Sequence, residues 1–79
     1  MFDDLLIDWV ALEPSSPGAD KSIAELEIRR RTGVTLIAII RGDQAITAPE
    51  PSEILRAGDR LGIVSRRQDI GPFRDLIVG

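Results

Sequence analysis

The side chains that could do chemistry in this sequence are carboxylates and arginines. The 79 residues include 13 acidic and 10 basic side chains, but no cysteine and no histidine. The chain therefore offers no thiolate, no disulfide and no imidazole, which is the commonest metal ligand and the usual general base. Acid–base catalysis would have to use carboxylates, and the best group of these is Asp20, Glu25 and Glu27. We expect that the protein is not an enzyme.

The same carboxylates have a structural explanation, because negative charge stabilises the first turn of a helix. Ser22 and Glu25 also have the spacing of a capping box, in which each side chain accepts a hydrogen bond from the other residue's backbone N–H. A divalent-cation site, built from these carboxylates or from Asp3, Asp4 and Asp8, stays an alternative, since hard cations need several oxygen ligands.

Arg29, Arg30 and Arg31 form the densest positive cluster. In the last turn of a helix they complement the partial negative charge of the helix end, and this explanation is favoured over a nucleic-acid patch. The net charge of −3 argues against binding through phosphate contacts, and two phenylalanines and one tryptophan are few for base stacking. We expect no nucleic-acid polymer as a partner.

These side chains must be positioned by few elements, organised around the apolar run Val34–Ile40. The run is interrupted only by Thr35 and is rich in β-branched residues, which predicts a strand buried on both faces. The capping box predicts a preceding helix from Ile23 to about Arg31, which Gly33 ends in the left-handed conformation.

The remaining elements follow from turn residues and apolar spacing. Leu55 is expected to anchor the proline-containing segment in the core, and Asp59 to accept backbone hydrogen bonds in a tight turn with Gly58. Ser65 is a candidate cap for a last helix, which Gly71–Pro72 either kinks or begins. Further strands are expected at residues 7–12, 45–47 and 60–65, with a hairpin turn at 42–44, and Ile70, Phe73, Leu76 and Ile77 on one face of the last helix.

The order strand, helix, strand, strand, strand, helix predicts an α+β fold with a small, mostly antiparallel sheet. We interpret residues 1–79 as a single domain, with 1–6 as a lead-in or linker stub. A chain of about this size buries only about 60% of its unfolded surface, and two helices cannot cover both faces of the sheet. We therefore expect an apolar patch that a two-fold partner buries.

No apolar stretch approaches the roughly 20 residues needed to span a bilayer, and the N-terminal MFDDLL lacks the basic region of a signal peptide. We expect a cytoplasmic protein.

Five segments in order resemble the TrkA-C domain, also called the RCK C-terminal domain, and the resemblance runs from about Ile7 to Ile77. The sequence is most similar to regulatory subunits of cation/proton antiporters, in its Ile-Asp-Trp start and in the Arg-x-Arg-x-Gly-Val end of the first helix. The segments are KSIAELEIRRRTGV, TLIAIIRG, ITAPEPSEIL, AGDRLGIV and PFRDLI.

The resemblance implies a regulatory module of potassium channels and potassium/proton antiporters that lies at the membrane through its transporter partner. Such modules form homodimers, and some bind cyclic di-AMP at the dimer interface, whereas others bind divalent cations or have no known ligand. We expect no resident cofactor and assign no metal-binding residues. A structural dimerisation module without a ligand and a divalent-cation sensor therefore stay as alternatives to a cyclic di-AMP sensor.

Carried over by position, the resemblance to the cyclic di-AMP binders implies seven ligand-binding residues. An arginine can pair with a phosphate through two hydrogen bonds, small apolar residues and a proline can contact an adenine face, and backbone N–H groups near Val34 can bond its edge. The competing explanation is that Ile23 belongs to the core and Arg29 only stabilises the helix end. The seven residues are Ile23, Ala24, Arg29, Val34, Thr35, Ala48 and Pro49.

Overall fold

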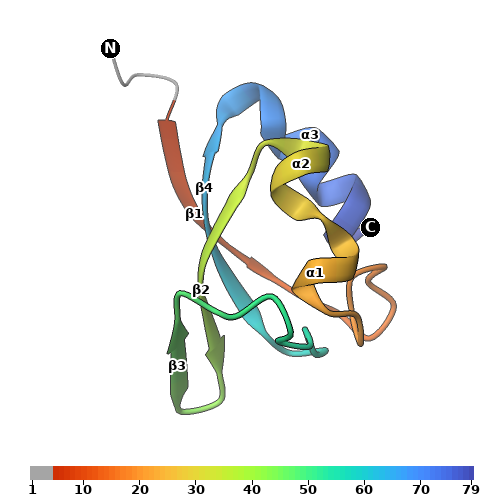
Figure 1. Ribbon diagram of the computed structural model, residues 1–79, viewed down its shortest axis with the longest axis vertical. Helices are drawn as coiled ribbons and strands as arrows, with labels where there is room; N and C mark the ends of the chain where they lie inside the picture. Colours follow the sequence, from red (N-terminus) through yellow and green to blue (C-terminus); the bar gives the residue numbers. More distant parts are fainter. Residues whose placement is uncertain (1–4) are drawn as a thin grey trace.

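The computed structural model describes residues 5–79 and has an α+β fold (Figure 1). The predicted fold class is confirmed, and so is the predicted alternation of strands and helical segments. The elements are β1 (Leu5–Ala11), α1 (Ile23–Leu26), α2 (Ile28–Thr32), β2 (Thr35–Arg41), β3 (Gln44–Thr47), β4 (Arg60–Arg66), the 3-10 turn η1 (Arg67–Asp69), α3 (Ile70–Phe73) and the π-helical turn η2 (Arg74–Val78).

The four strands form one antiparallel sheet in the spatial order β1-β4-β2-β3. The helices lie against one face of this sheet, which we call the inner face (Figure 1). β2 and β3 are joined by a two-residue turn, in which Gly42 takes a φ of 58° that glycine adopts without steric cost. β3 is short and pairs only with the second half of β2, from Ala38 onward.

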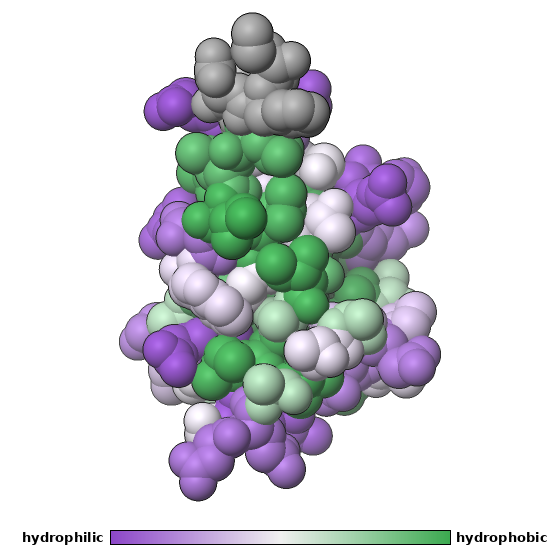
Figure 2. Space-filling view, turned by 90° about the vertical axis from the view of Figure 1, so that its left-hand side faces the viewer, coloured by the Kyte–Doolittle hydropathy of each residue, from purple (hydrophilic) through white to green (hydrophobic). Residues whose placement is uncertain are grey.

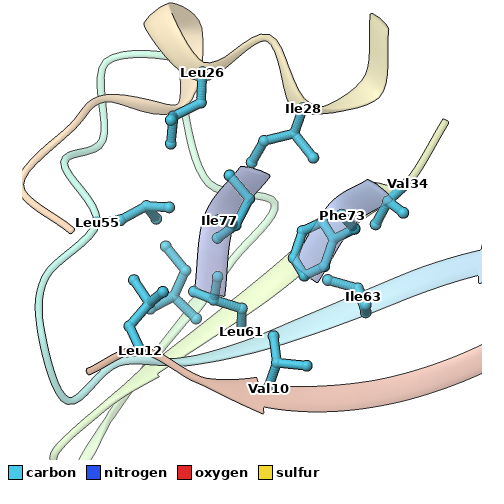
Figure 3. Packing of buried hydrophobic residues seen from close by; sticks show 11 residues of the cluster. Val10, Leu12, Leu26, Ile28, Val34, Leu55, Leu61, Ile63, Phe73 and Ile77 are labelled. Atoms are coloured by element: carbon cyan, nitrogen blue, oxygen red, sulfur yellow. The ribbon is translucent and has the colours of Figure 1, made fainter. Parts of the chain in front are cut away.

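The core lies between the inner face and the helices (Figure 3). Phe73 and Ile77 from the last helical segment pack over Leu61 and Ile63 of β4, so their predicted common face is confirmed. Leu55 is fully buried, which confirms its predicted role as the anchor of its loop. The other members of the core are Val10, Leu12, Leu26, Ile28, Val34 and Ile39.

The single helix predicted over residues 23–31 is wrong, because Glu27 divides it into α1 and α2. Glu27 has φ 49° and ψ 46°, a left-handed backbone conformation that residues other than glycine rarely adopt. Its neighbours Leu26 and Ile28 are both 4% exposed. Residues two apart lie on nearly opposite faces of a regular helix, so the break lets both side chains reach the core.

The predicted capping role of Ser65 is also wrong. Strand β4 continues to Arg66, and the helical turns begin at Arg67. Ser65 points into the core, 3% exposed, and its hydroxyl has no hydrogen-bond partner within residues 5–79. The helical turns then run from Arg67 through Pro72 to Val78, so the last helix does not begin at Pro72.

The prediction that the central strand is buried on both faces is wrong as well. Ile39 is fully buried, but Ile37, next to a bulge opposite β4, is 39% exposed. In the described part of the chain the second face of the sheet has no covering layer, and Figure 2 shows a band of apolar side chains there. We call this surface the outer face; its large exposed side chains are Leu5, Ile7, Trp9 and Ile37.

The first strand begins earlier than predicted, because Leu5 and Leu6 of the supposed lead-in pair with β4. Trp9 lies opposite Gly62, and its ring covers that glycine so closely that an added Cβ would come within 2.9 Å of ring atoms. The indole therefore lies flat on the outer face. Residues 1–4, with Asp3 and Asp4, lie outside the described residues. No helix within residues 5–79 is long and apolar enough to cross a membrane.

Candidate functional site

An open groove of about 490 Å³ lies between the two short helices, the start of β2 and the loop of residues 48–59, which we call the proline loop. Its volume is within the range of small-molecule sites, roughly 300–1,000 Å³. Most of its wall is apolar. The lining residues are Ile23, Ala24, Glu27, Ile28, Arg29, Arg30, Val34, Thr35, Leu36, Pro49 and Pro51.

The helical wall of the groove is fixed at both ends by caps that the sequence predicts. At the start of α1, the Ser22 hydroxyl accepts from the Glu25 N–H at 3.1 Å, and the Glu25 carboxylate accepts from the Ser22 N–H at 2.8 Å. At the end of α2, Gly33 has φ 83° and donates its N–H to the Arg29 carbonyl at 2.8 Å. The predicted capping box and the glycine cap are confirmed.

The proline loop is joined to the same helix by backbone hydrogen bonds. Ile23 N–H donates to the Glu53 carbonyl at 3.0 Å, and Ala24 N–H donates to the Pro51 carbonyl at 2.8 Å. The first N–H groups of α1 are therefore occupied by the loop and are not available to an anion. Arg29 and Arg30 are the cationic side chains that line the groove.

Arg41 holds the other end of the loop. Its guanidinium donates to both carboxylate oxygens of Asp59, at 2.9 and 2.8 Å, to the Glu53 carboxylate at 3.1 Å and to the Ile54 carbonyl at 2.9 Å. Asp59 is 1% exposed and also accepts from the Arg56 N–H at 2.9 Å, which confirms its predicted turn role. Arg41 thus fastens both Glu53 and Asp59 to the end of β2.

The pKa of Asp59 follows from these contacts. Burial alone would raise it, but the hydrogen bonds from Arg41 and from the Arg56 N–H hold the pKa of the Asp59 carboxyl below its ordinary value. The carboxylate is therefore ionised at neutral pH and fully paired in the interior.

The groove brings together six of the seven residues implied by the resemblance. Ala24, Arg29 and Thr35 are exposed there, whereas Ile23 is half-buried and packs against the core. The seventh, Ala48, does not line the groove. It has a φ of 46° and donates its N–H to the Ile37 carbonyl at 3.1 Å, so it turns the chain immediately before Pro49.

Val34 lines the groove, but its own N–H already has a hydrogen-bond partner. Its side chain is fully buried, and its N–H donates to the Thr32 hydroxyl at 3.1 Å, so this N–H is not free to bond the edge of an adenine. Thr32 in turn donates its hydroxyl to the Ile28 carbonyl at 2.6 Å. Val34 therefore shapes the floor of the groove through packing.

Three charged side chains line the groove. Glu27 accepts from the Arg30 Nε at 3.1 Å and from a second Arg30 nitrogen, which makes a two-point ion pair. The hydrogen bonds and charge of Arg30 lower the pKa of Glu27. Arg29 makes no salt bridge with any residue of the described range 5–79. Its guanidinium is the unpaired cation of the groove.

Sequence reasoning missed five of the residues that line the groove, which are Glu27, Ile28, Arg30, Leu36 and Pro51. The three-residue spacing of Glu27 and Arg30 was a usable signal, because such pairs meet on a helix surface. The Pro-Glu-Pro segment places Pro49 and Pro51 only two residues apart, so a groove at one of them was close to the other.

Among residues 5–79, the carboxylates considered for metal or acid–base chemistry do not form a cluster. Glu25 is used by the capping box and Glu27 by Arg30, and no group of three or more potential metal ligands occurs within residues 5–79. Asp8 accepts from the neighbouring Trp9 N–H at 2.8 Å.

Comparison with known proteins gives one family. The family model "TrkA-C domain" matches residues 8–78. The chain is 31% identical over 72 residues to the ammonium/H⁺ antiporter subunit AmhM of Alkalihalophilus pseudofirmus; the match covers 91% of this chain but only 43% of that protein. The chain thus spans less than half the length of this relative.

Two solved structures carry the same fold. The RCK C domain of the potassium transport protein KtrA, in complex with cyclic di-AMP, has a TM-score of 0.80 and 32% identity, with 91% of this chain and 82% of that one covered. BusR of S. agalactiae, in complex with its busAB promoter DNA, has a TM-score of 0.78 and 25% identity, with 86% of this chain and 33% of that one covered. The expectation that nucleic acid is not a partner therefore stays a prediction.

Proposed function

This chain belongs to the TrkA-C domain family, and we propose that it is a ligand-sensing regulatory domain of a potassium channel or a cation/proton antiporter. Its similarity to an antiporter subunit and to the RCK C domain of a potassium transport protein supports this assignment. In this proposal the domain works in the cytoplasm and acts on a membrane-embedded partner subunit, to which it transmits the binding of a small molecule.

The proposed ligand is cyclic di-AMP, and the observation that carries this proposal is the groove. It combines an unpaired arginine with apolar walls, which suits a nucleotide that has phosphates and flat bases. Arg29 would pair with a phosphate. Ile23, Ala24 and Pro49 would contact an adenine, and the exposed Thr35 hydroxyl would bond a polar edge.

The proposed assembly is a homodimer with the ligand at its interface. β2 borders both relevant surfaces, because Thr35 and Leu36 line the groove while Ile37 belongs to the outer face. Ile7 and Trp9, 72% and 50% exposed, extend this apolar surface across the sheet. A second copy would bury it, as the exposed apolar area of so small a domain favours.

Titration calorimetry with cyclic di-AMP tests the proposal. We expect binding at one nucleotide for every two chains, weakened at least about tenfold by Arg29→Ala, since charge-assisted hydrogen bonds contribute about 1.5–3 kcal/mol. Arg31→Ala is the matched control, because Arg31 lies outside the groove and borders a separate hollow with Pro72 and Leu76. Dimers that bind no nucleotide would support the structural dimerisation module instead.

A further inference from the structure

The charges in the groove are nearly balanced, although two arginines line it. Arg30 is occupied by Glu27, and Arg29 has no ion-pair partner within residues 5–79. With two arginines and one glutamate, the lining has a net charge of +1. Without Glu27 the groove would present two cations.

Glu27 is held at this position by the fold of the chain around it. Leu26 and Ile28 anchor it on either side in the core, and its own backbone is left-handed. A residue with a Cβ is strained in this conformation, whereas glycine is not. Residues in costly backbone conformations concentrate at functional sites. The burial of Leu26 and Ile28 explains the left-handed backbone at position 27, but it does not explain why a glutamate stands there instead of a glycine.

The net charge of the groove matches one class of phosphate. A phosphodiester carries a single negative charge, whereas a terminal phosphomonoester carries about −1.5 to −2 at pH 7. In a two-fold dimer a cyclic dinucleotide would present one phosphodiester to each groove. A linear dinucleotide with a 5′-phosphate adds a more strongly charged group, which the Glu27 carboxylate repels.

Resting on the proposed function, we infer that Glu27 is a specificity-determining residue of the groove. By neutralising Arg30 it leaves one cation for each phosphodiester, and it disfavours nucleotides that carry a terminal phosphomonoester. Glu27 thus makes the site selective for a cyclic dinucleotide over its linear, 5′-phosphorylated counterpart.

The test measures the dissociation constants of cyclic di-AMP and of linear 5′-phosphorylated diadenylate, pApA, by calorimetry at fixed ionic strength. The wild-type protein is expected to bind the cyclic nucleotide more tightly. In Glu27→Gln the ratio of the two constants should fall about twofold to fivefold, mainly through tighter pApA binding, because exposed charge interactions are of this size.

A double variant separates this role from a structural one. Glu27→Gln combined with Arg30→Gln again leaves Arg29 as the single cation, so pApA affinity should return to near the wild-type value. Glu13→Gln, the same change of charge in a loop outside the groove, should leave the ratio unchanged.

The outcomes are distinguishable. Cyclic di-AMP binding with an unchanged ratio in Glu27→Gln would overturn the inference while the proposed function stands. A double variant that keeps the relaxed ratio would overturn the mechanism of charge balance. No cyclic di-AMP binding to the wild-type protein would overturn the proposed function, and this inference with it.

Discussion

Arg41 and Arg29 both lie next to the proline loop, but their surroundings are opposite. Arg41 is bound by Asp59, Glu53 and a backbone carbonyl, and Asp59 is almost completely buried. Arg29 shares the groove with Pro49 and Pro51, is exposed, and makes no salt bridge with the described residues.

The contrast is between an arginine that stabilises the fold and one that, in our proposal, recognises a ligand. A buried charge must be paired, and its pairing fixes the elements that carry the partners. An exposed guanidinium without a partner costs the folded protein little and remains available for a phosphate. The Arg41 cluster therefore fixes the proline loop, whose Pro49 and Pro51 line the groove, and Arg29 in the same groove makes no salt bridge with the described residues.

The largest effect is expected from Arg41→Met. It leaves the Asp59 carboxylate buried without its cation, so the free energy of unfolding should fall by about 3–5 kcal/mol, measured by urea denaturation. Arg29→Met is the matched control and should change it by less than about 0.5 kcal/mol. Equal losses in the two variants would contradict the division of roles.

Lowering the pH should destabilise the Arg41–Asp59 contact. Because the pKa of Asp59 is lowered in the folded state, its stabilising contribution is complete above the unfolded-state pKa, about 3.9, and is lost as the pH falls through the folded-state value. The free energy of unfolding should be nearly constant from pH 8 to 5 and decrease below about pH 4. In Asp59→Asn this contribution to the decrease should disappear.

Parts of this arrangement were predictable and parts were not. The capping box at Ser22 and the glycine cap at Gly33 depend on neighbouring residues, so the sequence shows them directly. The Arg41–Asp59 pair joins residues that are 18 apart in the sequence, and no pattern of neighbouring residues predicts this contact. The break at Glu27 is decided by the burial of Leu26 and Ile28, which is tertiary packing overriding a continuous helix pattern.

The outer face shows a further limit of pattern reasoning. The run Val34–Ile40 has the composition of a strand buried on two faces, yet Ile37 is exposed in the single chain. In the proposed homodimer a second copy would bury Ile37, which would explain the apolar composition of this strand. Six of the seven expected binding residues line one groove, although their contacts with a ligand stay a prediction.

A smaller effect is expected on assembly from Ile7→Lys, at the most exposed apolar position of the outer face. A lysine buried against a second copy would weaken dimerisation at least about tenfold by desolvation of its charge. Sedimentation equilibrium measures this, with Ser15→Lys in an exposed loop as the control. Unchanged association in Ile7→Lys would place the dimer contact on another surface.

The most direct test of the groove as the binding site is a ¹⁵N–¹H correlation spectrum during titration with cyclic di-AMP. The account predicts the largest shifts at the amides of Ala24, Arg29 and Thr35, with little change at Arg41 and Asp59, whose contacts stay intact. Saturable binding that leaves the groove amides unshifted would contradict the account, because the ligand would then occupy a different surface.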